Sequence, residues 1–282
     1  MSTLREKRKK KQKAKRRRKT ADWTVVLILC AIAVCCGGYL VYHHWSVKQR
    51  ELEYEKMRQE EALSAATEAV IEEPETEEST EETVIYCDPV YDFGQLHEQN
   101  EDIYAWIVVP GTQVDYPLLQ SGTDNYYLDY NLDHSKGYPG CIYTNQCNRK
   151  DFSDYNTVLY GHNMKNGSMF GSIHSFEDET FFDGHPYIYV YTENERLTYE
   201  IYEAAKFTDV YIPSEYVVSS KDDRDQFLAD VREKVSDNKL HVREDMQIGE
   251  DDRLITLSTC VNGERNHRYL VIGVLVETAV YQ

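Results

Sequence analysis

Residues 254–280 read LITLSTCVNGERNHRYLVIGVLVETAV and contain two apolar runs separated by a short polar segment. The first run ends at Cys260, and Arg268 stands at the head of the second. If both runs are strands, they form a hairpin whose open corner holds a thiol and a guanidinium side by side. A nearby cation favours the thiolate form of a cysteine and stabilises a developing oxyanion, so Cys260 is a candidate nucleophile. The alternative is that Cys260 is a small buried hydrophobic residue at a strand end.

The chain from residue 84 to residue 282 has the composition of one globular domain, and its roughly 200 residues suffice for a hydrophobic core. Short segments rich in Val, Ile, Tyr and Thr, separated by turn-forming residues, predict a mainly β fold of the barrel or sandwich type. Helical patterns at residues 93–100 and 221–236 predict an N-terminal helix and a helix in a long strand connection. The predicted strands are residues 105–109, 116–119, 141–144, 157–160, 187–191, 197–205, 206–212, 254–258 and 269–280.

Residues 1–22 form a basic tail, with twelve Lys or Arg between Arg5 and Lys19. Residues 23–42 then carry no acidic side chain, Lys, Arg or His, and twenty residues at about 1.5 Å rise match a hydrocarbon core about 30 Å thick. We therefore predict a single transmembrane helix. A cleaved signal peptide is the competing interpretation, but its apolar stretch usually has only about 7–15 residues. The positive-inside rule predicts a cell-membrane protein with a cytoplasmic N-terminus and an extracellular C-terminal domain.

Residues 43–83 are predicted to connect the span to the globular domain. Residues 46–69 have the pattern of a charged helical stalk, and residues 72–82 are almost wholly Glu, Thr, Ser and Pro, a composition typical of an extended linker. Residues 1–50 carry a net charge of +12, so the rest of the chain carries −30. A basic block next to a membrane span is typical of an anchor for anionic lipid headgroups, so we expect no nucleic-acid partner.

Cysteine spacing indicates neither a zinc site nor a disulfide framework. There is no CxxC motif, and the spacings fit no common zinc site. No acidic calcium cluster can be placed either, despite the many carboxylates, so we expect no metal and no cofactor. Cys141 and Cys147 either pair in an oxidising space or remain free, and both possibilities stay open. The chain has three cysteines in or beside the predicted span and four after it: Cys30, Cys35 and Cys36, then Cys87, Cys141, Cys147 and Cys260.

A cysteine nucleophile needs a proton carrier, and His162 is the best candidate among the nine histidines. An apolar strand pattern ends at Gly161, and His162 opens a polar, glycine-rich loop. Loop residues on a rigid scaffold often carry catalysis. The alternative is a surface histidine in a turn. His267 is the main rival because it neighbours Arg268, whereas the remaining histidines lie near the span, in helical or polar stretches, or after no strand.

Three ordered segments together resemble the signature segments of the sortases, the membrane-anchored cysteine transpeptidases of Gram-positive bacteria. They are Leu159-Tyr160-Gly161-His162-Asn163, Thr256-Leu257-Ser258-Thr259-Cys260, and Arg268 ahead of Tyr-Leu-Val-Ile. The resemblance runs from Tyr91 to the C-terminus and is strongest to class B, through residues 162–171, Trp106, residues 116–120 and the two helical patterns. It implies a sortase-type β-barrel with N-terminal helices and a helix in a long strand connection, preceded by a single transmembrane helix.

The resemblance also implies a reaction. Cys260 would attack the carbonyl of the Thr in a C-terminal sorting signal and form a thioacyl-enzyme. An amine of the peptidoglycan cross-bridge, presented on a lipid-linked precursor, would then resolve it. His162 would act as general acid and then as general base, and Arg268 would hold the scissile carbonyl and its oxyanion. Arg265 is the rival on the same loop, but Arg268 enters the returning strand directly and so has a fixed position.

Substrate contacts implied by the resemblance fall at Ser258, Thr259, Asn125 and Leu128, and each position is equally compatible with packing or turn structure. Val261 follows the nucleophile where some relatives have a polar or acidic residue, which puts a contact from that position in doubt. The expected protein partners are surface proteins with a C-terminal sorting signal. Two other functions stay open. One is a pilin-polymerising sortase that uses a Lys amine, although no aromatic residue adjoins Asp88-Pro89 to complete a lid motif. The other is a non-catalytic, membrane-tethered binding domain.

Overall fold

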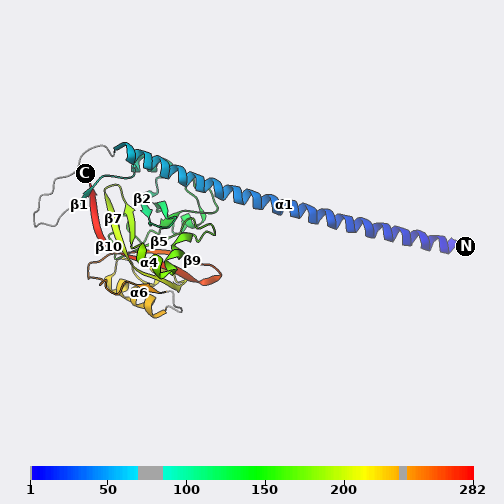
Figure 1. Ribbon diagram of the computed structural model, residues 1–282. Coiled ribbons are helices and arrows are strands. Elements are labelled where there is room, and N and C mark those ends of the chain that lie inside the picture. The colour runs from blue at the N-terminus through cyan, green and yellow to red at the C-terminus, as the bar shows by residue number, and fades with distance from the viewer. Residues whose placement is uncertain (1, 69–84, 235–239) are drawn as a thin grey trace, which may run out of the picture. The chain divides into compact units, whose positions relative to one another are not determined.

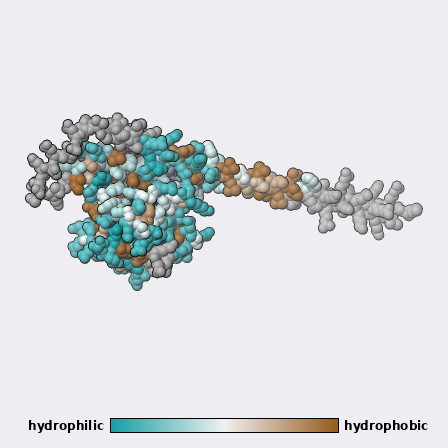
Figure 2. Space-filling model, in the orientation of Figure 1, coloured by the Kyte–Doolittle hydropathy of each residue, from teal (hydrophilic) through white to brown (hydrophobic). Residues whose placement is uncertain are grey.

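The computed structural model describes residues 2–68, 85–234 and 240–282. The chain divides into two compact units, Met1–Arg50 and Glu51–Gln282. Helix α1 (Ser2–Glu68) is continuous through the end of the first unit and the start of the second. It contains a stretch that is long and apolar enough to cross a membrane, and Figure 2 shows the apolar side chains gathered along it. The boundaries and orientation of the span stay predictions, and the acidic linker at residues 72–82 lies outside the described residues.

Eight strands close into a barrel within the second unit, so the prediction of a mainly β barrel is confirmed. Strand β10 (Glu264–Tyr281) pairs with β9 on one side and with β7 on the other, which closes the ring. Going round from β9 (Leu254–Val261), the order is β5 (Asn156–Tyr160), β4 (Ile142–Thr144), β3 (Asp115–Leu119), β2 (Ile103–Val108), β6 (Tyr187–Tyr191) and β7 (Glu195–Thr208). Two short strands extend this sheet outside the ring: β1 (Ile85–Cys87) beside β10, and β8 (His241–Val242) beside β7.

Strand β7 corrects one prediction. Residues 197–205 and 206–212 were expected to be two strands, but β7 runs unbroken from Glu195 to Thr208. Its pairing with β10 extends from Glu195 opposite Val280 to Thr208 opposite His267, because no turn-forming residue interrupts this stretch. Ile212 instead begins the short helix α5 (Ile212–Glu215), with Pro213 in its first turn, where a missing N–H has no cost.

Helices cover parts of the barrel surface (Figure 1). The predicted N-terminal helix is α2 (Phe93–Gln99), which starts where the Asp92 carboxylate accepts a hydrogen bond from Gln95 N at 3.1 Å. The helix predicted at residues 221–236 is α6 (Lys221–Lys234), and Phe227, Leu228 and Val231 are buried as expected. Further short helices were not predicted: α3 (Tyr126–Asp129), the 3-10 helix η1 (Gly171–Glu177) and α4 (Glu179–Gly184).

The buried hydrophobic residues form two clusters, one inside the barrel and one on its outer face. Ile255 and Leu257 of β9 belong to the interior cluster, whereas Leu254 packs in an outer cluster together with Phe227 and Val231 of α6. Successive side chains of a strand point to opposite faces, so even-numbered positions of β9 face outward. The same alternation places Val158 of β5 and Leu270 of β10 on the outer face. The chemistry predicted at Cys260 therefore belongs to the outside of the barrel.

Candidate active site

Cys260 and Arg268 lie directly opposite each other in the antiparallel pair β9–β10. Opposed residues of such a pair project to the same face, so the predicted hairpin corner is confirmed. The connection is a tight turn at Asn262 and Gly263, across which Val261 pairs with Glu264. Gly263 has φ +79°, which a glycine adopts at little cost. The irregularity lies instead in residues 265–267, which bulge out of the ladder on the β10 side.

His162 is brought to the same place by the parallel pair β5–β9. Tyr160 lies opposite Ser258. Tyr160 is two residues before His162, and Ser258 is two residues before Cys260. Hydrogen bonds tie the residues on either side of His162 to β9: Thr259 Oγ1 donates to the Gly161 carbonyl at 2.7 Å, and Asn163 Nδ2 donates to the Cys260 carbonyl at 2.7 Å. Neighbouring strands are about 4.8 Å apart. Positions 162, 260 and 268 thus form one row across three adjacent chain segments.

The His162 ring is oriented by residues that precede β4. Its Nε2 lies 2.7 Å from the Leu128 carbonyl oxygen, and a carbonyl only accepts, so Nε2 carries a proton. The Tyr138 ring lies against the imidazole, with a centroid separation of 4.8 Å. Since Nε2 is engaged, Nδ1 is the ring nitrogen that remains for proton transfer with a substrate.

The backbone of Cys260 is held by a network that sequence patterns missed. The Asn163 amide lies 2.9 Å from His174 Nε2, and His174 Nδ1 lies 2.8 Å from a Glu177 carboxylate oxygen. A carboxylate only accepts, so Nδ1 of His174 carries the proton, and in the neutral ring Nε2 is an acceptor. The Asn163 amide therefore donates one hydrogen to His174 Nε2 and the other to the Cys260 carbonyl. The Cys260 thiol itself is exposed. The sequence signals available were the position of Asn163 next to His162 and the i, i+3 spacing of His174 and Glu177.

Arg268 is half-buried, and its Nη1 donates to the carbonyls of Arg265 at 3.3 Å and His267 at 3.0 Å. These bonds fold the side chain over its own bulge. Burial raises the pKa of Tyr160 far above its ordinary value, and the Arg268 charge is among the groups that oppose this rise. Arg265 and His267 both belong to the bulge, and His267 Nδ1 pairs with Glu264 at 3.0 Å.

A row of tyrosines extends the site along the outer face. The Tyr160 ring lies 5.6 Å from Tyr143 and 6.1 Å from Tyr211, centroid to centroid. Burial raises the pKa of Tyr143, and nearby Cys260 contributes to that rise. Burial also raises the pKa of Tyr211 to about 12. These phenols are therefore neutral at physiological pH and provide an amphipathic surface beside the thiol.

The predicted substrate contacts fall in different surroundings. Ser258 is almost fully buried on the same face of β9 as Cys260, whereas Thr259 is buried on the opposite, barrel-facing side. Asn125 is exposed at φ +59°, and its Oδ1 accepts from Tyr143 at 3.0 Å and Asn145 at 3.3 Å. Leu128 has an exposed side chain, and its carbonyl binds His162. All four lie on segments that border the row of Cys260, His162 and Arg268.

Cys141 and Cys147 are not joined by a disulfide bond in the structure. Cys141 is buried directly before β4, and Cys147 is exposed in the loop after this strand. Among the residues that the structure describes, no group of three or more His, Cys, Asp or Glu side chains is arranged to hold a metal ion.

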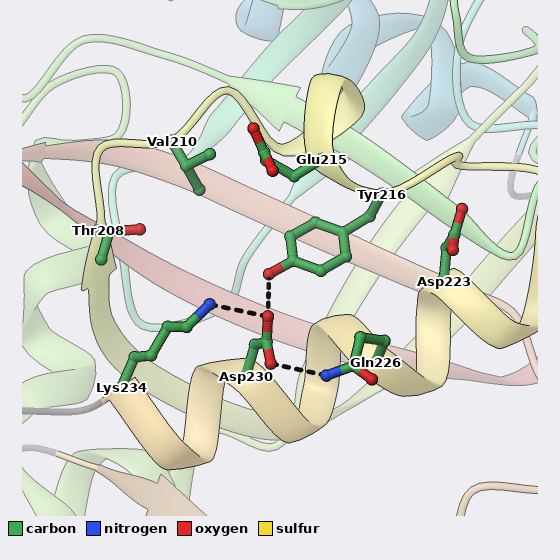
Figure 3. A pocket seen from close by; sticks show the side chains of 8 residues that line it. All are labelled: Thr208, Val210, Glu215, Tyr216, Asp223, Gln226, Asp230 and Lys234. Atoms are coloured by element: carbon green, nitrogen blue, oxygen red, sulfur yellow. Dashed lines mark hydrogen bonds and ion pairs between the residues drawn. The ribbon is translucent and has the colours of Figure 1, made fainter.

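A separate hollow of about 380 Å³ lies beside helix α6 (Figure 3). Its polar side chains converge on Asp230, which accepts hydrogen bonds from Tyr216 at 2.5 Å, Gln226 at 2.7 Å and Lys234 at 2.8 Å. The Lys234 ammonium is the main reason that the pKa of Asp230 falls to about 2. Asp230, Tyr216, Gln226 and Lys234 satisfy one another's hydrogen bonds, and the lining residues include no cysteine or histidine, so we do not assign the hollow as the active site.

Comparison with known proteins agrees with this site. A family model described as Sortase domain matches residues 107–276. Sortase B of Listeria monocytogenes is 34% identical over 168 residues, which cover 58% of this chain and 65% of that protein. Sortase B of Staphylococcus aureus is 26% identical over 261 residues, covering 91% and 97% of the two chains. The crystal structure of Clostridium perfringens sortase B superposes with a TM-score of 0.59 at 30% identity, covering 66% of this chain and 100% of the other.

Proposed function

Because this chain belongs to the sortase family, and to class B within it, we propose that it is a cysteine transpeptidase that joins surface proteins to the cell wall. It cleaves a C-terminal sorting signal after a Thr residue through a thioacyl-enzyme on Cys260. It then transfers the protein to an amine of the peptidoglycan cross-bridge, carried on a lipid-linked precursor. The basic tail, residues 1–22, and the span, residues 23–42, hold the enzyme in the cell membrane with the catalytic domain outside.

One observation carries the proposal: Arg268 lies directly across from Cys260 on the outer face of the barrel, and the segment of His162 is hydrogen bonded to β9 at residues 259 and 260. A nucleophile, a proton carrier and a cation within one row are the groups that acyl transfer requires, and their alignment supports the proposal.

In the first half-reaction the Cys260 thiolate adds to the Thr carbonyl carbon and forms a C–S bond. The peptide C–N bond breaks, and the departing amine takes the proton from Nδ1 of the His162 imidazolium. Nε2 keeps its own proton because the Leu128 carbonyl holds it. The products are a thioester on Cys260, a neutral His162 and a free amine.

In the second half-reaction the acceptor amine attacks the thioester carbonyl and gives its proton to Nδ1 of His162. The C–S bond breaks, a new amide forms, and the thiolate–imidazolium pair returns. Arg268 stabilises the oxyanion of both tetrahedral intermediates, as a planar guanidinium with two parallel donors can. Ser258, Asn125 and Leu128 are our proposed side-chain contacts to the substrate, with Ser258 nearest the thiol along its face of β9. Thr259, whose side chain is buried toward the barrel interior, is proposed to contact the substrate through its backbone.

The test uses the full chain in detergent with peptides that contain Asn-Pro-x-Thr or Ser-Pro-x-Thr sequences, followed by intact-protein mass spectrometry. We expect an acyl adduct on Cys260 and none in Cys260→Ala. His162→Ala should slow release of the leaving amine by about 10²–10⁴-fold. Cys147→Ala, which removes another exposed thiol, is the matched control and should keep the adduct. The absence of an adduct with every such peptide would contradict the proposal.

A second arm of the experiment separates the acceptors. A cross-bridge peptide amine should resolve the wild-type adduct, whereas faster resolution by a Lys-containing pilin peptide would indicate pilus assembly instead. A non-catalytic binding domain would bind the peptides equally well before and after Cys260→Ala and would form no adduct.

A further inference from the structure

We propose that residues Glu51–Arg58 of helix α1, here called the strut, position His162 for catalysis by bracing the two loops that hold it. The inference rests on the proposed function, since it assigns to these residues a role in the same reaction. Sequence analysis places residues 46–69 in a stalk that links the span to the domain. The structure shows that one face of this segment is packed on the barrel domain.

The strut is docked through a buried aromatic face. Tyr54 and Met57 are 4% and 3% exposed, whereas Leu52 on the same helix is 41% exposed. The Tyr54 ring packs edge-on against Tyr116 of β3 at 5.2 Å between centroids, and the Arg58 guanidinium lies 5.3 Å above the same Tyr116 ring. A stalk that served only as a spacer would need no buried tyrosine. Docking of this kind makes the strut part of the catalytic domain.

The first connection from the strut to His162 runs through Gly140. Tyr54 OH lies 3.2 Å from the Gly140 carbonyl oxygen and 3.4 Å from Cys141 Sγ. Burial, with Cys141 as a further cause, raises the pKa of Tyr54 well above its ordinary value, so the hydroxyl stays protonated and donates.

Gly140 in turn packs on the group that orients His162. It has φ +68°, and a Cβ there would lie 2.6 Å from the Tyr127 carbonyl oxygen and 3.0 Å from that of Leu128. The Leu128 carbonyl is the acceptor for His162 Nε2 at 2.7 Å. A shift of Gly140 toward or away from Leu128 therefore moves the acceptor that sets the tautomer and direction of the catalytic ring.

The second connection runs through the loop that follows His162. Glu51 is hydrogen bonded to Asn166 Nδ2 and to Ser168 Oγ, the latter at 3.3 Å. This loop folds back on itself, with Phe170 N donating to the His162 carbonyl at 3.0 Å and Asn163 bridged to Met169.

Tyr116 joins the two connections. Its hydroxyl accepts from Met169 N at 3.2 Å in the loop after His162, while its ring contacts Tyr54 of the strut. The strut thus contacts the segment before β4 through Tyr54. It contacts the loop after β5 directly through Glu51 and indirectly through Tyr116 of β3. His162 lies between these two supports, so we assign Tyr54 as a positioning residue.

The test compares Tyr54→Phe with wild type in the full chain in detergent, using the single-turnover release of the leaving amine from a sorting-signal peptide. Tyr54→Phe keeps the ring and removes only the hydroxyl, so the fold is retained. Loss of one such hydrogen bond should slow release by roughly 5-fold with KM unchanged. Tyr54→Ala, which also removes the packing, should slow it by up to about 10²-fold. Gln59→Glu, at an exposed position on the same helix just beyond the strut, is the matched control and should leave the rate unchanged.

A double-mutant cycle separates positioning of His162 from a general structural effect. In the His162→Ala background, Tyr54→Phe should cause no further loss, because the ring that the hydroxyl positions is gone. Alkylation of Cys260 by iodoacetamide should be equal in wild type and Tyr54→Phe. An unchanged rate in Tyr54→Phe, or the same 5-fold loss with and without His162, would overturn the inference. If Cys260→Ala still abolishes the adduct, that result leaves the proposed transpeptidase intact; if it does not, the proposed function itself fails.

Discussion

The two sides of the active site are built differently. Cys260 and Arg268 belong to long strands and are placed by a ladder of backbone hydrogen bonds, whereas His162 follows the end of a strand and is placed by side chain–backbone bonds from loops. A backbone ladder needs no particular side chain to persist. The loop arrangement needs Thr259, Asn163 and the Leu128 carbonyl, each at a fixed distance. The nucleophile and its cation are thus rigid by topology, while the proton carrier is rigid only through specific contacts.

The strongest test on the strand side is Arg268→Lys. Lysine keeps the charge but has no planar pair of donors, and loss of a fixed oxyanion donor costs about 10²–10³ in kcat. Acylation kinetics with the sorting-signal peptide measure this effect. Arg265→Lys, in the neighbouring bulge, is the matched control and should change the rate little. Equal losses of acylation rate in both variants would mean that the position of Arg268 opposite Cys260 has no special role.

The junction between the two sides is tested by Thr259→Val. The substitution removes the buried bond from Thr259 Oγ1 to the Gly161 carbonyl and should lower the free energy of unfolding by about 1–3 kcal/mol. Because Gly161 precedes His162, acylation should also slow, by about 10-fold, which is less than the roughly 10²-fold that a 1 Å misplacement can cost. Urea unfolding and acylation kinetics give the two values.

Thr256→Val is the control for that junction. Thr256 Oγ1 donates to Asn156 Oδ1 at 2.8 Å on the same two strands, away from the active site. The Thr256→Val variant should lose a similar free energy of unfolding and keep the wild-type acylation rate. A slow Thr256→Val variant would show that the rate follows overall stability rather than the position of His162.

The smallest effect on rate is expected at Glu203, in the part of β7 that faces helix α6. Glu203 is fully buried, and its carboxylate lies 3.5 Å from Arg232 Nε. Burial raises the pKa of Glu203 from 4.5 to about 7, and Arg232 only partly opposes this. The folded state therefore holds the proton of Glu203 more tightly than the unfolded state does, so the contribution of this group to stability is greatest below pH 4.5 and falls as the pH rises to about 7. At about 1.4 kcal/mol for each pH unit, the loss is roughly 3 kcal/mol.

Glu203→Gln should remove this pH dependence and stabilise the protein at pH 8, as thermal unfolding between pH 5 and pH 8 would show. Glu215→Gln, at an exposed position, is the control and should leave the slope unchanged. The acylation rate should be that of wild type in both variants. An altered rate in Glu203→Gln would mean that the barrel wall under α6 and the active site are more closely coupled than the contacts indicate.

Much of the fold was predictable because its signals are local. Short segments rich in Val, Ile, Tyr and Thr between turn-forming residues predicted most barrel strands, and the apolar face of residues 221–236 predicted α6. The division of residues 197–212 into two strands was wrong because strand length depends on the partner: β10 offers pairing along the whole of β7. The short helices α3, α4 and η1 have too few residues for a periodic pattern to develop.

The candidate site divides in the same way. Cys260, His162 and Arg268 were identified from ordered motifs at the ends of apolar runs. Asn163, His174 and Tyr138 were missed as parts of the site, because their importance depends on contacts with residues distant in the chain. Asn163 donates to the Cys260 carbonyl across 97 residues, and His174 Nε2 lies 3.1 Å from the same oxygen across 86 residues. Nothing in the local sequence indicates that a histidine on a short helix will face the backbone of a nucleophile.

The amino-acid sequence by itself determined the class of fold, the apolar segment near the N-terminus and the three side chains proposed for the chemistry, because composition, periodicity and motif order are properties of neighbouring residues. Only the tertiary structure decided the register that sets Arg268 opposite Cys260, the loop contacts that orient His162, and the docking of Tyr54 on Gly140, 86 residues away. Register and docking arise from pairing between distant segments, and that pairing is decided when the barrel closes and the strands bury their apolar faces together.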